Sequence, residues 1–211
     1  MNFLAHLLLA GDDDGLRLGA MLGDFIHGNP DNSNLSAATR KGVQLHRFID
    51  QYIDSLPEVV QLRQQFPVRF RRYGGIIIDL AFDHELALRW DEFSSLSLSE
   101  FDEGIRGLLA RHEEELPEEL KRFMRYADQR GLFANYRNED EILFSLKGIG
   151  KRLSRPNPLH QVADIWEDMK PGFRQCFGTA FPHVQAAVDG WLAEAHVGVA
   201  GQGSDKRSTA P

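Results

Sequence analysis

Seven side chains of the types that ligate metal ions stand in apolar segments of the first 84 residues. They are His6, Asp24, His46, Asp50, Asp79, Asp83 and His84. Buried carboxylates need a cation or good hydrogen-bond partners, because an isolated charge in an apolar interior costs kilocalories. Imidazole and carboxylate donors without a thiolate favour Mn²⁺, Mg²⁺ or Fe²⁺, with Zn²⁺ as an alternative. The pattern predicts a metal centre in the core of a helical bundle.

The segment at residues 73–90, YGGIIIDLAFDHELALRW, carries three of these side chains. Read as a helix, it places Asp79 and Asp83 on one face, since residues four apart lie one above the other. His84 lies about 100° further round the helix. The segment is apolar on nearly every side, which is typical of a buried helix. We predict that Asp79 ligates the metal, and that Asp83 and His84 either join it or form a hydrogen-bonded pair in the core.

The other candidates come from three earlier segments. His46 and Asp50 are four residues apart beside the apolar stripe of a long predicted helix, so they share a face. Asp50 either ligates the metal or hydrogen-bonds to His46 and orients it, as ligating histidines usually require. Asp24 stands on the apolar face of another predicted helix, which favours a ligand. His6, among leucines, is either a further site residue or a histidine of the core.

The chain that must position these side chains reads as helical almost throughout. Apolar residues recur at helical spacing, and no segment shows a strong β-alternation. The predicted helices lie at residues 3–10, 16–27, 36–55, 57–66, 73–90, 99–114, 117–132, 139–153, 159–169 and 182–195. The expected fold is therefore an all-α multi-helix bundle. We expect one domain at residues 1–196 and a disordered tail at residues 197–211.

The composition of the chain excludes several classes of protein. Hydrophobic residues (42%) and charged residues (26%) occur at ordinary levels for a globular protein, and the net charge of −7 argues against broad binding to nucleic acid or anionic membrane. The sequence has no apolar run long enough for a membrane helix and no convincing signal peptide. The single cysteine, Cys176, excludes an internal disulfide and a cysteine-based zinc site. Nucleophile-elbow, P-loop and dinucleotide-binding motifs are absent. We expect a cytoplasmic protein.

Positive charge is nevertheless concentrated in two places on this acidic chain. One cluster directly precedes the 73–90 segment, and the other lies in and after the helix predicted at residues 139–153. Such clusters either bind a local anionic partner or are solvated helix ends. They consist of Arg63, Arg69, Arg71 and Arg72, and of Lys147, Lys151, Arg152 and Arg155.

Four motifs occur together in a fixed order: MNFLAHLLLA, GAMLGDFIHG, GVQLHRFIDQYIDSLP and YGGIIIDLAFDHELA. They resemble the acyl carrier protein phosphodiesterase family, also called holo-acyl-carrier-protein hydrolases, and the resemblance extends to about residue 195. That family is an α-helical relative of the HD-domain phosphohydrolases with a different motif order. The resemblance implies removal of 4′-phosphopantetheine from holo-acyl carrier protein, a carrier of fatty acid biosynthesis, with Mn²⁺ or Mg²⁺ as cofactor. The seven side chains named above occupy the matching positions.

The residues and the resemblance predict the same chemistry. A hard metal ion would polarise a phosphoryl oxygen and lower the pKa of bound water, which then attacks the phosphorus. The serine of the carrier leaves and is protonated by His84 or His46. We expect catalytic roles for Asp79, His84, His46 and His6, metal ligation by Asp24, His46, Asp50, Asp79, Asp83 and His84, and docking of the acidic carrier or its phosphate by Arg69, Arg71 and Arg72.

Two other functions stay open at this point. An HD-like phosphohydrolase would act on a nucleotide or another small phosphoester, and its activity would not depend on the arginine cluster. A non-catalytic helical module would bind an acidic partner without a metal, so the substitution Asp79→Ala would leave its binding intact.

Overall fold

Helices account for the regular structure in the computed structural model, which describes residues 1–127, 131 and 133–200. They are α1 (Phe3–Leu9), α2 (Asp14–Leu22), α3 (Ala37–Ser55), α4 (Pro57–Gln65), α5 (Val68–Arg71), α6 (Gly74–Leu88), α7 (Leu98–Arg111), α8 (Glu118–Ala127), α9 (Glu139–Arg152) and α10 (Ala163–Ala200), with short 3₁₀ turns between some of them. The described residues contain no β-strand, so the predicted all-α class is confirmed. No described helix combines the length and the apolar character needed to cross a membrane.

Polar side chains mark where several helices begin. The hydroxyl of Ser36 accepts a hydrogen bond from the backbone N–H of Thr39 at the start of α3. Ser97 and Glu100 form a reciprocal capping box at the start of α7. The carboxylate of Asp13 accepts the N–H of a first-turn residue of α2. Each cap satisfies backbone donors that have no partner within the helix, and is worth about 1 kcal/mol.

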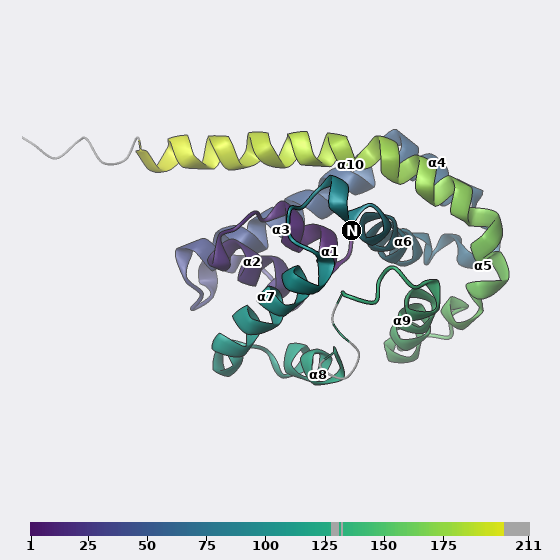
Figure 1. Ribbon diagram of the computed structural model, residues 1–211, viewed down its shortest axis with the longest axis horizontal. Coiled ribbons are helices and arrows are strands. Elements are labelled where there is room, and N and C mark those ends of the chain that lie inside the picture. The colour runs from purple at the N-terminus through teal and green to yellow at the C-terminus, as the bar shows by residue number, and fades with distance from the viewer. Residues whose placement is uncertain (128–130, 132, 201–211) are drawn as a thin grey trace, which may run out of the picture.

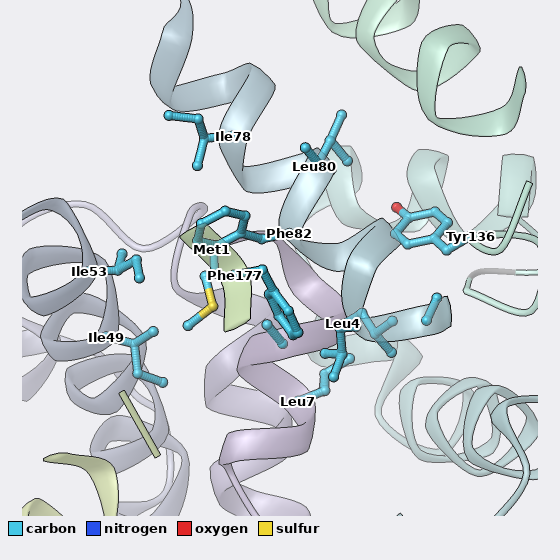
Figure 2. Close-up of a cluster of buried hydrophobic side chains, with 14 of the residues drawn as sticks. Met1, Leu4, Leu7, Ile49, Ile53, Ile78, Leu80, Phe82, Tyr136 and Phe177 are labelled. Carbon is cyan, nitrogen blue, oxygen red and sulfur yellow. The ribbon is translucent and has the colours of Figure 1, made fainter. Parts of the chain in front are cut away.

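The helix α6 lies near the middle of the molecule, next to α1, and α10 runs across it (Figure 1). The helix α6 also packs against α4 and α9. Most of its residues are buried, which confirms the buried helix predicted at residues 73–90. Figure 2 shows the apolar cluster around it, in which Phe82 meets the edge of Phe177 at 5.6 Å between ring centroids, with Met1 and Leu4 close by. Burial of each such large side chain contributes about 1.5–3 kcal/mol.

Two glycines let α2 and α3 approach closely. A Cβ on Gly19 would collide with the backbone of Thr39 and Val43 in α3. A Cβ on Gly42 would collide with the backbone of Leu16 in α2. This close packing brings the chain that follows α2 next to the middle of α3.

The helix α2 ends at Leu22, earlier than the predicted residue 27. The N–H groups of Phe25 and Ile26 both bond to the carbonyl oxygen of Leu22, so residues 23–25 form a turn at the end of the helix. Asp24 therefore lies in a turn after α2. The sequence had predicted it on the apolar face of the helix.

The prediction of two separate helices at residues 159–169 and 182–195 was wrong. One helix, α10, runs through both Pro171 and Pro182 for 38 residues, or about 57 Å. Each proline costs on the order of 3 kcal/mol inside a helix. The buried side chains of Phe173, Phe177 and Phe181 offset that cost along the same helix.

The predicted tail begins inside α10. This helix continues to Ala200, so residues 197–200 are helical and residues 201–211 lie outside the described part of the chain. Part of the helix predicted at residues 117–132 also lies outside it, because α8 is described as far as Ala127.

Candidate metal centre

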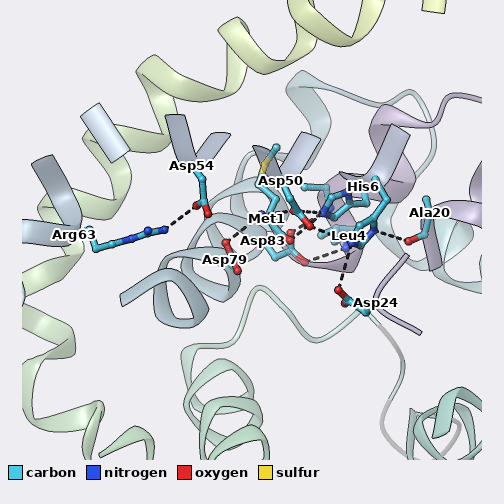
Figure 3. A network of polar contacts seen from close by, with 12 residues as sticks. Met1, Leu4, His6, Ala20, Asp24, Asp50, Asp54, Arg63, Asp79 and Asp83 are labelled. Atoms are coloured by element: carbon cyan, nitrogen blue, oxygen red, sulfur yellow. Dashed lines mark hydrogen bonds and ion pairs between the residues drawn. The ribbon is translucent and has the colours of Figure 1, made fainter. Parts of the chain in front are cut away.

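Three of the predicted side chains meet where α1 and α3 cross. His6, His46 and Asp50 each offer a nitrogen or oxygen atom within 4.8 Å of the others. One carboxylate oxygen of Asp50 lies 3.0 Å from Nε2 of His6, and the other lies 3.1 Å from Nε2 of His46. Figure 3 shows this carboxylate at the middle of a network of polar contacts. Asp50 thus connects the two histidines, and the three residues form a candidate metal site, called the metal cluster below.

A hydrogen bond to the backbone fixes the orientation of the His46 ring. Its Nδ1–H donates to the carbonyl oxygen of Ala20 at 2.8 Å, so Nε2 is left to face Asp50 and, at 3.3 Å, Asp24. A Cβ on Gly23 would overlap the imidazole ring, so glycine at this position makes room for it. Histidines that ligate metals usually donate their other ring N–H to a backbone carbonyl or a carboxylate, as Nδ1 of His46 does here.

His6 is fully buried and stacks on His46, with ring centroids 3.9 Å apart and an interplanar angle of 12°. Its Nε2 lies 3.0 Å from the carbonyl oxygen of Met1 and 3.0 Å from Asp50. Its Nδ1 is buried and has no hydrogen-bond partner among the described residues. Buried polar atoms are rarely left unpaired in folded proteins. The unpaired nitrogen of His6 fits a site that a bound cation would complete.

The cluster is buried on its histidine side and open on its carboxylate side. The side chains of Asp24, Asp50 and Asp79 are 57%, 42% and 37% exposed. The amino nitrogen of Met1 lies 3.0 Å from Asp79 and 3.4 Å from Asp50. Partial burial raises the pKa of Asp79 against the attraction of that ammonium group. Asp79 therefore lies at the open edge of the cluster.

Asp83 faces α1 and holds its first turn. Its carboxylate is fully buried and accepts the backbone N–H groups of Leu4 at 2.9 Å and Ala5 at 3.1 Å. Asn2, which precedes the helix, makes no capping bond with its side chain. Burial raises the pKa of Asp83 to about 7, although both backbone hydrogen bonds favour the charged form. The contacts of Asp83 thus position α1, and with it His6.

His84 points to a different part of the molecule. Its Nδ1–H donates to the carbonyl oxygen of Tyr136 at 2.7 Å, and its Nε2 lies 3.9 Å from a carboxylate oxygen of Glu139. Its ring lies 6.2 Å from that of Trp166 in α10. One residue along a helix turns the side chain by about 100°, so His84 faces α9 and α10 while Asp83 faces α1. The structure does not bring His84 to the metal cluster.

Hydrogen bonds within the cluster oppose the effect of burial on charge. Burial disfavours the charged form of His46, but hydrogen bonds to Asp24 and Asp50 outweigh it and raise the pKa of His46 to about 9. Burial, together with the charge of His46, lowers the pKa of His6 to about 4. Burial would raise the pKa of Asp50, yet the hydrogen bonds to both histidines hold it below its usual value. The hydrogen bond to His46 likewise lowers the pKa of Asp24. A protonated His46 between two carboxylates is therefore the charge arrangement that a metal ion would replace.

The arginines predicted to bind the carrier differ in how they are held. Arg69 lies 3.3 Å from Asp164 and donates to the side chain of Gln161 at 2.9 Å. Arg71 donates through Nε to the carbonyl oxygen of Phe66 and is otherwise exposed. Arg72 is exposed as well.

Sequence reasoning missed an ion pair beside the open edge. Arg63 lies 2.7 Å from Asp54, which stands one helical turn after Asp50 in α3 (Figure 3). The arginine side chain packs closely over Gly74 and Gly75, where an added Cβ would lie 3.1 Å and 3.2 Å from its atoms. The four-residue spacing from Asp50 to Asp54 was the available signal.

Histidines and carboxylates that project from several helices into a shared core are typical of helical metalloproteins. Comparison with known proteins identifies the family of the chain. A family model described as acyl carrier protein phosphodiesterase matches residues 1–184. The chain belongs to the acyl carrier protein phosphodiesterase family.

Named relatives agree with this assignment. The acyl carrier protein phosphodiesterase of Photorhabdus laumondii is 31% identical over 190 residues, which cover 90% of this chain and 96% of the relative. Proteins of the same name from Escherichia coli and Klebsiella pneumoniae are 33% and 34% identical, each over 80% of this chain and 86% of the relative. No solved structure shows a significant match to the chain.

Proposed function

We propose that this protein hydrolyses the phosphodiester bond between 4′-phosphopantetheine and the serine of holo-acyl carrier protein, releasing the apo protein. The observation that carries the proposal is the metal cluster of His6, His46 and Asp50, with its exposed carboxylate edge, in a chain of this family. We assign the reaction to the cytoplasm, as expected from a chain whose one cysteine, Cys176, is free and buried.

We propose that a divalent cation binds at the metal cluster, with Mn²⁺ as the first candidate and Mg²⁺ or Fe²⁺ as alternatives. His46 and Asp50 would hold it, with Asp24 as a further donor at the open edge and His6 behind them, while Asp79 at the same edge would stay unligated. The donor set is mixed imidazole and carboxylate, which suits these ions. When bound, such an ion supplies Lewis acidity toward a phosphoryl oxygen and lowers the pKa of a coordinated water.

The residues of the chain would supply position and protons. The carbonyl oxygen of Ala20 keeps His46 in one tautomer and one orientation, and Asp83 keeps α1 and His6 in place. Asp79 stands at the open edge, so we propose it as the group that protonates the departing serine oxygen. His84, on the α9 side of α6, would support the fold of that region.

The test is incubation of the purified protein with holo-acyl carrier protein and Mn²⁺, followed by the intact mass of the carrier. We expect loss of phosphopantetheine, no loss in the presence of a chelator, and no loss with the variant Asp50→Asn. A carrier that keeps its prosthetic group, under conditions where a known phosphodiesterase removes it, would contradict the proposal. Turnover of nucleotides or small phosphodiesters in its place would favour the phosphohydrolase alternative.

A further inference from the structure

We infer that the acidic carrier protein docks on a surface formed jointly by α5 and the end of α9. This surface, called the basic surface below, rests on the proposed function and deepens it by locating the partner. In the sequence, the two positive clusters lie about 80 residues apart. The fold brings one end of each cluster together. The basic surface comprises Arg71, Arg72, Lys151, Arg152 and Arg155.

Two hydrogen bonds join the parts of the basic surface. The hydroxyl of Tyr73 donates to the carbonyl oxygen of Pro156 at 3.2 Å. Arg72 and Arg155 directly precede these two bonded residues, so the tyrosine side chain links the two segments that carry them. Arg69 donates to Gln161 at 2.9 Å and thereby ties α5 to the chain that follows α9. Arg69 is thus a connection within the surface, while Arg72 and Arg155 are its exposed charges.

The exposed cations of the surface are available to a partner. Within the described part of the chain, Arg72, Lys151, Arg152 and Arg155 form no ion pair, and all four are exposed. Apolar side chains stand among them, since Val68 is 79% exposed and Leu153 is 37% exposed. Aliphatic contacts framed by cations suit an acidic protein face better than a free anion.

The net charge of the whole chain also limits where an acidic partner can bind. The protein carries a net charge of −7, so an acidic partner is repelled by most of its surface. A local basic surface therefore selects both where the partner lands and how it is oriented, because complementary charge mainly sets association rate and register.

The helix α6 leads from the basic surface toward the open edge of the metal cluster. Tyr73 directly precedes α6, and Asp79 follows six residues later, which is about 9 Å along the helix axis. A phosphodiester attached directly to a serine gives the carrier little reach, so its docking surface must adjoin the site. Arg63, packed against the first turn of α6 and paired with Asp54, lies between the two.

The experiment compares a charge-reversal pair, Arg72→Glu with Arg155→Glu, against a control pair, Arg122→Glu with Arg125→Glu. The control residues belong to α8, at the lower edge of Figure 1 and away from α5. Steady-state kinetics with holo-acyl carrier protein should show KM raised at least tenfold and kcat within twofold for the first pair. The control pair should stay within twofold in both. The wild-type KM should rise with added salt, and the KM of the first pair should not.

Unchanged KM in the first pair, or an equal increase in the control pair, would overturn the docking surface. If the melting temperature shows that the reversal pair is misfolded, Arg72→Gln with Arg155→Gln gives the same test with a smaller change. Failure of the wild-type protein to release phosphopantetheine would instead overturn the proposed function. The two failures are therefore distinguishable.

Discussion

The helix α6 has polar residues on two sides, and the two sides differ in how their charges are satisfied. On the α9 and α10 side, Lys170 lies 2.6 Å from Glu139 and 3.0 Å from Glu167, and Arg174 lies 3.8 Å from Glu85. On the α1 and α3 side of the described chain, carboxylates outnumber cations, and a buried histidine nitrogen lacks a partner among the described residues. The first side is a set of ion pairs. The second side offers carboxylate oxygens and an imidazole nitrogen as ligands for a cation.

This difference teaches that a buried polar residue is informative only together with its partners. Asp83 and His84 are adjacent in sequence and equally buried, yet one holds α1 and the other bonds to Tyr136. Helix geometry turns the two side chains about 100° apart, and the elements packed against α6 determine what each one contacts. The predictions below ask whether the two sides of α6 also differ in function.

The largest expected effect is on catalysis at the α1 and α3 side. Asp50→Asn should lower kcat/KM on the order of 10³-fold, because Asp50 connects both histidines and loss of a metal is worth several kcal/mol. His84→Gln, on the other side, should change kcat/KM by less than tenfold. The kcat/KM of both variants is measured with the mass assay at several carrier concentrations. Equal losses in the two variants would remove the distinction between the sides.

The next effect concerns the space that holds His46. Gly23→Ala should weaken Mn²⁺ binding by about 10–100-fold, since the added methyl group would displace the imidazole ring. Isothermal titration calorimetry measures this affinity directly. The matched control is Gly104→Ala in α7, where a Cβ meets nothing within 4 Å. Unchanged metal affinity in the Gly23 variant would show that Mn²⁺ binding does not depend on the present position of the His46 ring.

A smaller effect tests whether Asp83 holds α1. Asp83→Ala should lower the free energy of unfolding of the metal-free protein by about 1–3 kcal/mol, because two buried N–H groups lose their acceptor. Thermal unfolding followed by circular dichroism should show a decrease of roughly 2–10 °C. If the melting temperature stays the same while metal binding disappears, Asp83 is a ligand and our assignment is wrong.

The smallest effect lies on the ion-paired side. Burial raises the pKa of Glu85 above its ordinary value of 4.5, against the attraction of Arg174. The folded state therefore holds this proton more tightly than the unfolded state, and the resulting stability is present below pH 4.5 and is lost as the pH rises through the raised pKa. Glu85→Gln should flatten the pH dependence of stability in that window.

Urea unfolding at a series of pH values tests this, with the exposed Glu103→Gln as control. A Glu85→Gln curve parallel to that of the wild type across this window would show that Glu85 is not desolvated in the folded protein.

Much of the fold and part of the site could be predicted from the sequence. Helical spacing indicated most helices, and the spacing of His46 and Asp50 placed both on one face, since side chains four apart point the same way. The sequence could not separate Asp83 from His84, because that separation depends on which helices pack against α6. It also could not show that Asp24 follows the end of α2, where a turn replaces the expected helix.

Long-range packing explains the other differences. The continuous α10 depends on buried phenylalanines that offset two prolines, and a local rule for proline cannot weigh them. The basic surface depends on the contact between Tyr73 and Pro156, which are 83 residues apart. In both cases the deciding interaction lies outside any local sequence pattern.

Anomalous diffraction at the manganese absorption edge, from crystals grown with Mn²⁺, tests the central claim most directly. We expect an anomalous peak within about 2–2.5 Å of Nε2 of His46 and a carboxylate oxygen of Asp50, in the range usual for metal–ligand bonds. A peak beside His84 and Glu139, with none at His46, would contradict the account and move the metal to the other side of α6.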